Sequence, residues 1–424
     1  MADVDQRGFD NQPAWLDAAQ AARFLDVKRP TLYAYVSRGL VRRVRNEEGT
    51  RYSRDDLQRL RARHDARSGH GPVAAGALRW GEPVLSSAIT DLRADGPRYR
   101  GRSAVELAAT GTPFESVAEL LWTDSLPAAR PEWPAALPLP LGKLHALLPP
   151  RPTAFGVLLV TVATLRTRDP SPYAVGLEAE LARARALSRT LAGAVALAFD
   201  REGRRRATTA LAAPSMARAA AWALGGGSDR ATVAAVEEAL VLSADHELNA
   251  SSFTARIAAS TGADLYACIE AALATLSGPR HGGECDRFEA LLIEAGDGRR
   301  GDAARRARAV VAARAQRGEP LPGFGHRLYR GGDPRAARLL HVARRLDRRA
   351  IATVDAIVDA VARGGGEAPA LDAGLVAVAR AAGFPPGAAG ALFALGRTAG
   401  WIAHVLEQRT EPNLLRPRAR YVGR

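Results

Sequence analysis

The sequence predicts an all-α protein in which a small basic module precedes a large helical body, and three observations support this. From residue 78 onward leucine and alanine recur at every third or fourth position, which is the spacing of one helical face. Alternation of apolar and polar residues is scarce there, and aromatic residues make up only 6% of the chain, so little β-structure is expected. Prolines and glycine clusters end the periodic stretches, which favours a bundle of roughly fifteen or more helices.

Residues 14–65 read as a separate unit at the start of the chain. Asp17 is placed to cap a first helix, and a short break at 28–30 separates that helix from a second one over 31–39. Alternating apolar and basic residues over 41–52 surround a Glu-Glu-Gly turn, as in a small β-hairpin. This order of helix, turn, helix and wing is a layout of DNA-binding proteins.

The composition places a domain boundary after this unit. Ser53 and Asp56 form a capping box that opens a third helix, and a Gly/Ala/Pro-rich stretch over 68–77 follows as a linker. We therefore predict a winged helix-turn-helix domain over 1–67 and a separate body that begins at residue 78.

The first unit is strongly basic, with eleven basic and four acidic residues between Lys28 and Arg63. It resembles the winged helix-turn-helix domain of the MerR and excisionase group, and this resemblance implies a DNA partner. The candidate DNA contacts on the second helix and the wing are Tyr33, Arg38, Arg42, Arg43 and Arg45. Arginine supplies 57 of the 59 basic residues of the chain, a compositional bias that weakens the charge signal. The alternative is a protein-contact or dimerisation module that has lost DNA binding.

Several classes of protein lack support in the sequence. Cys268 and Cys285 form neither a disulfide framework nor a metal-ligand spacing, so we expect a reducing compartment and no metal. The N-terminus has no apolar signal-peptide core, and the longest apolar runs, such as 154–165, are too short to span a bilayer. We therefore expect a cytoplasmic protein without a membrane partner. Motifs for nucleotide hydrolysis, dinucleotide binding and zinc proteolysis do not occur.

Four polar positions stand out in the apolar helical body. His246 is predicted to share a helical face with Asn249 and Phe253, and His281 lies in a loop before two glycines. His326 lies in the stretch GFGHRLYRGGDPR, and Asp372 lies near a helix start. Each has a purely structural alternative, since buried histidines and first-turn carboxylates are common. Together they can supply a base, an acid and an electrophile, and the nearby arginines suit an anionic keto acid.

The chain resembles citrate synthase along nearly all of residues 78–424. The resemblance implies the all-α citrate synthase fold, with a large domain over 78–281 and 372–424 and a small domain over 282–371 that closes on it. The segments that carry the resemblance, in order, are SSAITDL, RYRG, FESVAELLW, HELNASSFTAR, STGADLY, GPRHGGE, GFGHRLYRGGDPR, GRTAGWIAHVLEQ and RPRARYVG.

The same resemblance implies a role for each candidate residue. Asp372 matches the base that removes a proton from acetyl-CoA, His281 the group that stabilises the enolate, and His326 the group that activates the oxaloacetate carbonyl. The remaining matches are oxaloacetate contacts at His246, Arg335, Arg397 and Arg416, the last donated across a homodimer, and CoA contacts at Gly323, Gly325 and Arg330. No cofactor is expected beyond acetyl-CoA as a co-substrate.

Three functions stay open at this stage. The first is citrate synthase, which condenses acetyl-CoA with oxaloacetate. The second is 2-methylcitrate synthase, which uses propionyl-CoA, because one methylene is worth only about 1–3 kcal/mol of selectivity and no residue decides it. The third is a DNA-binding regulator whose citrate synthase-like domain senses a ligand.

Overall fold

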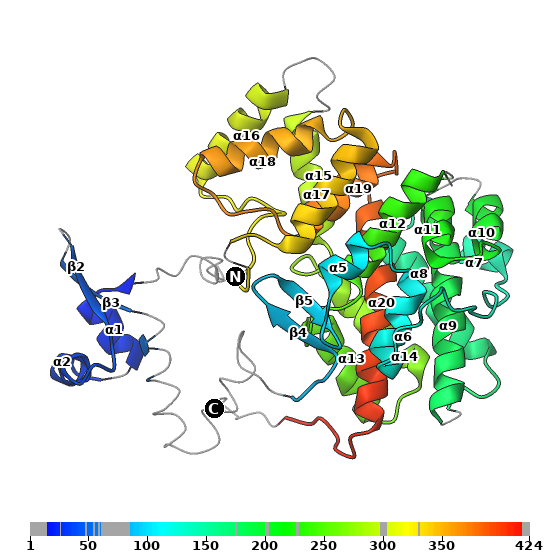
Figure 1. Ribbon diagram of the computed structural model, residues 1–424, viewed down its shortest axis with the longest axis horizontal. Helices are drawn as coiled ribbons and strands as arrows, with labels where there is room; N and C mark the ends of the chain where they lie inside the picture. Colours follow the sequence, from blue (N-terminus) through cyan, green and yellow to red (C-terminus); the bar gives the residue numbers. More distant parts are fainter. Residues whose placement is uncertain are drawn as a thin grey trace, which may run out of the picture. The chain divides into compact units, whose positions relative to one another are not determined.

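Figure 1 shows the computed structural model of the chain. It describes residues 15–25, 27–46, 49–53, 56–57, 60, 85–173, 176–199, 203–225, 229–296, 303–329 and 331–417. The chain divides into two compact units at residues 86 and 87. Each unit is built around its own hydrophobic core.

Among its described residues, the first unit contains the helices α1 and α2, further helical residues at 56, 57 and 60, and a small antiparallel sheet with the strand order β1-β3-β2. Its elements are β1 (Trp15–Leu16), α1 (Ala18–Leu25), α2 (Arg29–Ser37), β2 (Arg43–Asn46) and β3 (Gly49–Ser53). The predicted cap is confirmed, because Asp17 Oδ1 accepts the backbone N–H groups of Ala19 and Gln20. The predicted hairpin is confirmed as β2 paired with β3.

The predicted break at 28–30 is wrong in position, because α2 already begins at Arg29. Pro30 lies in the first helical turn, where its missing N–H would have no intrahelical partner anyway. Gly39 follows the helix with a φ of 71°, as expected of a C-terminal stop. In the predicted capping box, the Asp56 N–H donates to Ser53 Oγ at 3.4 Å. The predicted linker at 68–77 lies outside the described residues.

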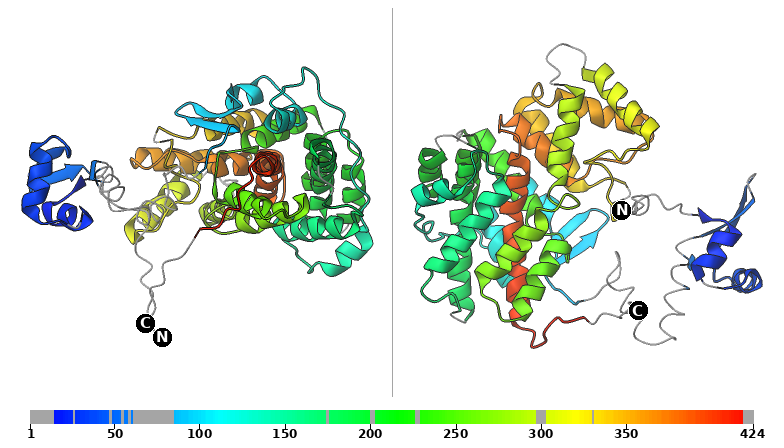
Figure 2. Two further views of the ribbon diagram at one scale, coloured as in Figure 1. Left: turned by 90° about the horizontal axis from the view of Figure 1, so that it is seen from below. Right: turned by 180° about the vertical axis from the view of Figure 1, so that it is seen from behind.

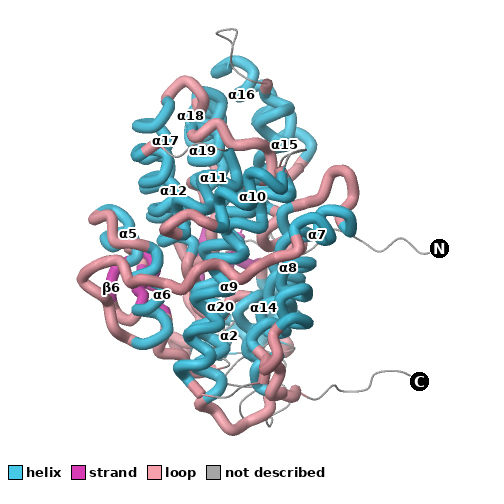
Figure 3. Tube along the Cα trace, turned by 90° about the vertical axis from the view of Figure 1, so that its right-hand side faces the viewer, coloured by secondary structure: helices cyan, strands magenta, loops and turns pink. Residues whose placement is uncertain are grey.

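The second unit is helical, which confirms the predicted class. Its helices are α5 (Ala104–Ala109), α6 (Phe114–Thr123), α7 (Leu141–Leu147), α8 (Ala154–Arg168), α9 (Leu177–Ala194), α10 (Gly203–Leu211), α11 (Met216–Gly225), α12 (Arg230–Ser243), α13 (Ala250–Ser260), α14 (Leu265–Leu276), α15 (Glu284–Ala295), α16 (Ala303–Arg317), α17 (Pro334–Asp347), α18 (Ala352–Arg363), α19 (Leu371–Ala381) and α20 (Ala388–Arg409). Helices make up most of this unit in the view of Figure 3. In the described part of the chain, no helix is long and apolar enough to cross a membrane.

A small sheet in this unit was not predicted. Its strands are β4 (Thr90–Arg93), β5 (Gly96–Tyr99) and β6 (Arg102–Ser103), in that antiparallel order. The strands are too short for a period-two pattern to be recognised in the sequence. Gly96, with a φ of 117°, begins the second strand directly after the turn.

Helix α20 runs through the middle of the second unit (Figures 1 and 2). It packs against α6, α8, α9, α12, α13, α14, α15 and α19 and is buried along almost its whole length. Its glycines permit close backbone contact: a Cβ at Gly396 would lie 2.7 Å from the Leu240 carbonyl oxygen. The core therefore sets the position of every side chain that α20 presents.

Two segments far apart in the sequence meet at the start of α19. The Ala370 N–H donates to the Gly323 carbonyl at 2.8 Å, and the Gly325 N–H donates to the Ala368 carbonyl at 2.9 Å. This pairing brings the GFGH loop beside the first turn of α19. His326 and Asp372, which are 46 positions apart in the numbering, are thereby carried by adjoining segments.

An ionic clamp, formed by two buried glutamates and the exposed Arg130, stabilises the segment that follows α6. Arg130 bridges Glu115 and Glu237, and their carboxylates also accept the backbone N–H groups of Met216 and Phe114. Both glutamates are buried, with exposed fractions of 1% and 8%. The clamp ties the chain after α6 to the helical core.

Candidate active site

The GFGH loop and α17 form one side of a compact polar cluster. His246 Nε2 lies 3.0 Å from the Tyr329 hydroxyl, and the rings of His246 and His326 are 5.1 Å apart between centroids. The Tyr329 ring stacks on His326 at 4.6 Å, and the Arg335 guanidinium lies 5.6 Å from the same ring. Three residues singled out in the sequence therefore meet around one tyrosine.

Arg335 is held by one partner and leaves a nitrogen free inside the protein. Asp333 caps α17 through the Arg335 N–H and binds the guanidinium at Nε (3.0 Å) and Nη2 (2.7 Å). Arg335 is 2% exposed, and its Nη1 has no hydrogen-bond partner among the described residues. An unpaired buried guanidinium nitrogen is costly unless an anionic ligand binds to it.

Arg397 supplies a second buried cation from α20. Its Nε donates to the Ser243 carbonyl at 2.8 Å, and its guanidinium lies 4.9 Å from the Phe393 ring. Burial lowers the pKa of Arg397 to about 10, with Asp245 raising it and Arg335 lowering it further. Arg397 still carries its charge at neutral pH, so two buried guanidinium groups act on the same region.

The two histidines beside these arginines are neutral at pH 7. Burial, followed by the charges of Arg335 and Arg397, holds the pKa of His246 well below its usual value. Burial and Arg335 also lower the pKa of His326. The Leu328 N–H donates to His326 Nδ1 at 3.2 Å, so the proton of the neutral ring is on Nε2.

The predicted helical face of His246, Asn249 and Phe253 is wrong. Helix α12 ends at Ser243 and α13 begins at Ala250, so His246 lies in the loop between them. Asn249 is the N-cap of α13, and its Oδ1 accepts the backbone N–H groups of Ser251 and Ser252. The spacing of His246, Asn249 and Phe253 mimics one helical face, but Asn249 is the residue that caps the start of α13, so His246 lies before the helix.

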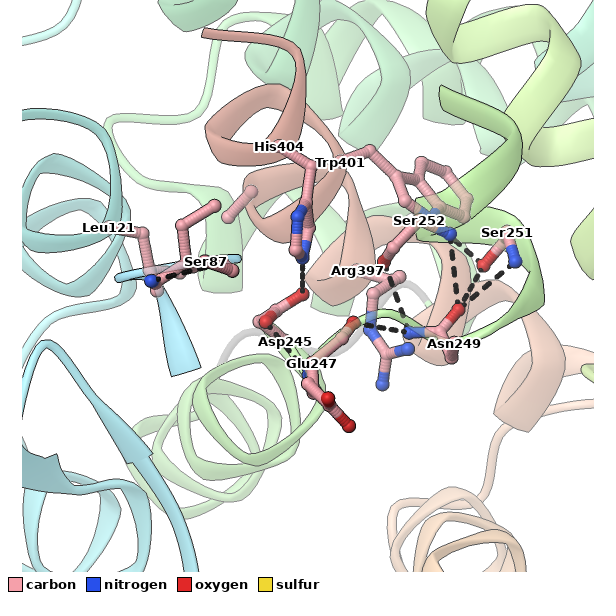
Figure 4. A network of polar contacts seen from close by, with 12 residues as sticks. Ser87, Leu121, Asp245, Glu247, Asn249, Ser251, Ser252, Arg397, Trp401 and His404 are labelled. Carbon is pink, nitrogen blue, oxygen red and sulfur yellow. Dashed lines mark hydrogen bonds and ion pairs between the residues drawn. The ribbon is translucent and has the colours of Figure 1, made fainter. Parts of the chain in front are cut away.

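A buried pair fixes this loop against α20 (Figure 4). His404 Nε2 lies 3.4 Å from Asp245 Oδ1, and both residues are fully buried. Asp245 Oδ2 also accepts the Glu247 N–H at 3.1 Å. His246 is therefore held on both sides by contacts of its immediate neighbours.

His281 lies on the other side of the cluster, in the turn before α15. Its Nε2 is 2.9 Å from Ser251 Oγ, which also accepts the Trp401 indole N–H at 3.0 Å (Figure 4). The His281 ring lies 6.1 Å from that of Phe393. Burial and the charge of Arg397 lower the pKa of His281 to about 4, so the ring is neutral at pH 7 and Nδ1 remains available to a ligand.

Asp372 lies in the first turn of α19, as predicted, and keeps partial exposure. Its Oδ1 accepts a hydrogen bond from the Cys285 thiol at 3.2 Å. Burial raises the pKa of Asp372 to about 6, with Glu284 raising it and Arg335 lowering it. This carboxylate is therefore ionised at neutral pH and more basic than an ordinary aspartate.

The glycines of the GFGH loop make room for the protein itself. A Cβ at Gly323 would lie 2.7 Å from the buried Phe288 ring, whereas one at Gly325 would meet only the end of the exposed Glu367 side chain. Both have positive φ, at 79° and 82°. Packing therefore explains the missing side chain of Gly323, backbone conformation that of Gly325, and any ligand contact at either would involve the backbone.

One predicted substrate contact, Arg416, is not brought to this cluster. The predicted CoA contact Arg330 lies outside the described residues. Arg416 is exposed in the segment after α20 and forms no hydrogen bond or ion pair with other described residues. The cluster within one chain consists of His246, His281, His326, Arg335, Asp372 and Arg397.

In the first unit, the candidate DNA contacts differ in availability. Tyr33 is 49% exposed on α2, and Arg38 and Arg43 are exposed at the end of α2 and on β2. Arg42 binds Asp56 through Nε at 2.8 Å and Nη2 at 3.1 Å, so its guanidinium already has a structural partner. The side chain of Arg45 lies outside the described part. A pocket between α2 and the wing is lined by Tyr33, Val36, Ser37, Gly39, Val41, Arg42 and Arg43.

The sequence alone did not identify four further side chains that contact the cluster residues or their partners. Tyr329 lies in the stretch GFGHRLYRGGDPR, three residues after His326, but this stretch is not helical, so that spacing does not predict a contact. Ser251, Trp401 and Cys285 read as ordinary helix residues. Their contacts join separate helices, and no sequence pattern reports such contacts.

The fold and the cluster define a helical protein in which two buried guanidinium groups and neutral histidines lie beside a basic carboxylate, preceded by a helix-turn-helix unit. The chain belongs to the citrate synthase family: the family model "Citrate synthase, C-terminal domain" matches residues 77–418. A second model, "Helix-turn-helix domain", matches residues 15–65. Both parts of the resemblance seen in the sequence are confirmed. The described residues contain no cluster of three or more His, Cys, Asp or Glu side chains that could hold a metal ion.

Curated relatives carry two activities in their names. "Citrate synthase 2" of Bacillus subtilis is 34% identical over 45% of this chain, and the match spans only 51% of that protein. "2-methylcitrate synthase" of Mycobacterium tuberculosis is 30% identical over 77% of this chain and 84% of that protein.

Solved citrate synthases share the fold. The enzyme of Thermotoga maritima is 26% identical, with a TM-score of 0.65 over 81% of this chain and 94% of that chain. The enzyme of Thermoplasma acidophilum, in a ternary complex with carboxymethyl coenzyme A and oxaloacetate, is 24% identical, with a TM-score of 0.69 over 82% of this chain and 96% of that chain. At that identity the second likeness shows the fold alone.

Proposed function

We propose that the protein condenses acetyl-CoA with oxaloacetate and hydrolyses the resulting thioester to citrate and CoA. The observation that carries this proposal is the buried, unpartnered Nη1 of Arg335 beside His326, with Arg397 as a second buried cation. Such a site suits a small dicarboxylate, and guanidinium forks suit carboxylates. Family membership supplies the reaction class.

Oxaloacetate would bind between Arg335, Arg397 and His246. The Nε2–H of neutral His326 would donate a hydrogen bond to the keto oxygen and draw electron density from the carbonyl carbon. After the new carbon–carbon bond forms, His326 would give its Nε2 proton to the alkoxide and take one up again from solvent. Burial, followed by the charge of Arg335, keeps the ring neutral before the reaction, so it acts as a donor through its tautomer.

The acyl-CoA would be activated by Asp372 and His281. Asp372 would remove a proton from the methyl carbon next to the thioester. With the Ser251 hydroxyl turned to donate to Nε2, His281 would carry its proton on Nδ1 and stabilise the enolate oxygen. That carbon then attacks the keto carbon of oxaloacetate, and water cleaves the thioester. Because the pKa of Asp372 is raised to about 6, turnover should fall as the pH drops below that value and the base becomes protonated.

A closing motion would protect the reactive thioester from water. We assign a large domain to 78–281 and 372–424 and a small domain to 282–371, with the boundaries at His281 and Asp372. The CoA moiety would meet the backbone of Gly323 and Gly325 and the side chain of Arg330. Closure of α15 to α18 would then bring these groups to the acyl chain.

A homodimer would complete the site. Arg416 is exposed and has no partner among the described residues of its own chain, as expected of a side chain that a second copy uses. Arg416→Ala should raise the KM for oxaloacetate, and sedimentation analysis should find a dimer. A monomer with full activity would contradict this part of the proposal.

The test is the release of CoA thiol from acetyl-CoA or propionyl-CoA in the presence of oxaloacetate. Faster turnover with acetyl-CoA supports citrate synthase, and faster turnover with propionyl-CoA supports the 2-methylcitrate reaction named for the mycobacterial relative. Wild-type protein lacking turnover with either thioester, while it still binds oxaloacetate, would refute the enzymatic proposal. Asp372→Asn serves as the matched inactive control.

The helix-turn-helix match favours a second function, which is DNA binding by the first unit. We propose that Tyr33, Arg38 and Arg43 contact DNA, because they are exposed on α2 and the wing. Affinity for duplex DNA should fall steeply as the salt concentration rises. Lack of binding at low salt would leave the module as a protein-contact unit. Both functions can reside in one chain, with ligand binding in the second unit as the sensed event.

A further inference from the structure

Cys285 lies directly behind the proposed base. Its Sγ is 3.2 Å from Asp372 Oδ1, and the cysteine is fully buried whereas Asp372 is partly exposed. Cys285 is the second residue of α15, four positions after His281. One loop-and-helix junction therefore carries both a proposed enolate-stabilising group and a contact to the base.

The direction of this hydrogen bond follows from the chemistry of the two groups. An ionised carboxylate can only accept, so the thiol must donate its proton. Burial, and then the charge of Asp372, raises the pKa of Cys285 well above its usual value, which keeps the thiol neutral. The bond is thus S–H to carboxylate at any pH at which Asp372 is ionised.

We propose that Cys285 is a positioning residue that anchors Oδ1 of Asp372 and leaves the other carboxylate oxygen to take the substrate proton. The role rests on the proposed condensation reaction. The Cys285 hydrogen bond is the strongest effect that lowers the pKa of Asp372 against burial, and because a thiol is a weak donor it costs less basicity than a stronger donor would. A hydroxyl or amide at this position would stabilise the anion more strongly and make a poorer base.

None of the charged groups around Asp372 replaces the hydrogen bond from Cys285. Glu284 acts on it from the start of α15 and disfavours the anion, while Arg335 on α17 favours it at longer range. Arg397 on α20 is also coupled to Asp372. Cys285 is the only side chain in the described part of the chain that hydrogen-bonds the Asp372 carboxylate.

Two substitutions should move the pH profile in opposite directions. Cys285→Ser supplies a stronger donor, so the acidic limb of kcat/KM should shift to lower pH and the plateau should fall. Cys285→Ala removes the donor, so the limb should shift to higher pH and kcat should fall up to about tenfold, with the KM for oxaloacetate unchanged. The matched control is Cys268 on α14, which is equally buried and whose thiol donates a hydrogen bond to the Ala263 carbonyl. The positioning role would be overturned if the acidic limb of the kcat/KM profile stayed in place in both Cys285 variants. It would also be overturned if the limb moved equally in Cys268→Ser.

Infrared spectroscopy tests the contact without turnover. The S–H stretching band of Cys285, assigned by its loss in Cys285→Ala, should shift as Asp372 titrates and in Asp372→Asn. If the wild-type protein is active but the S–H band does not change with the charge of Asp372, the inference about Cys285 is wrong while the condensation reaction stands. Inactive wild-type protein would refute the condensation reaction and, with it, any catalytic meaning of the contact, whatever the band does.

Discussion

Replacing Asp372 with asparagine should stabilise the fold at alkaline pH while it removes activity. In the folded protein, burial raises the pKa of this carboxylate from 3.8 to about 6. In the unfolded chain the group ionises near its ordinary value of about 4. As the pH rises from about 4 to about 6, the unfolded state loses its proton first, so folding stability declines. Above about pH 6 the full cost of the buried charge remains.

The cost can be bounded from these values. A difference of about two pH units corresponds to about 3 kcal/mol, and the partial exposure of Asp372 reduces this to about 1–2 kcal/mol. Asparagine keeps the shape and can still accept the Cys285 hydrogen bond, so it removes the charge alone. The variant should therefore unfold later than wild type near pH 8, with a Tm gain of about 2–4 °C, and match it near pH 4.

Two measurements on the same variant check this reasoning. Thermal unfolding of both proteins across the pH range should show a gap that opens between about pH 4 and about pH 6. Release of CoA thiol should fall by roughly 10²–10⁴-fold, as expected on loss of a general base. An equal Tm difference at both ends of the range would show that Asp372 pays no desolvation cost, and the argument from burial would fail.

Three other substitutions test separate parts of the structure. Arg130→Ala should lower the free energy of unfolding by about 3 kcal/mol, because two buried glutamates lose their cation; an unchanged thermal midpoint would count against the clamp. Gly323→Ala should impair both folding and activity, since its Cβ would lie 2.7 Å from the buried Phe288 ring, whereas Gly39→Ala, with open space around it, should cost only about 1 kcal/mol of stability. Arg42→Ala should destabilise the first unit, while Arg43→Ala should leave it stable and reduce the salt slope of DNA binding by about one. Identical behaviour of the two arginine variants in unfolding and binding would refute that distinction.

The sequence predicted the helices well because their physical determinants are local. Leucine and alanine spacing, the Asp17 cap and the Gly39 stop act within a few residues, and the structure confirms them. The errors have local causes as well. The predicted break at Pro30 fails because the first turn of a helix tolerates proline. The short sheet of β4 to β6 escaped notice because its strands are shorter than a recognisable alternating pattern.

The functional cluster divides in the same way. Its charged members were found in the sequence because motif order and spacing carry the family resemblance, which the family model confirms over residues 77–418. The sequence could not show that Tyr329 joins His246 to His326, or that Cys285 stands behind Asp372. These contacts join side chains 83 and 87 positions apart.

By itself, the sequence determined the helical class, the two units and the chemical groups available to a keto acid and a thioester. Tertiary structure alone decided the protonation and the hydrogen-bond partners of these groups. Burial between packed helices leaves Arg335 with a free nitrogen, keeps the histidines neutral and makes Asp372 more basic. Desolvation is a property of everything that surrounds a group, and those surroundings come from segments that meet only when the chain is folded.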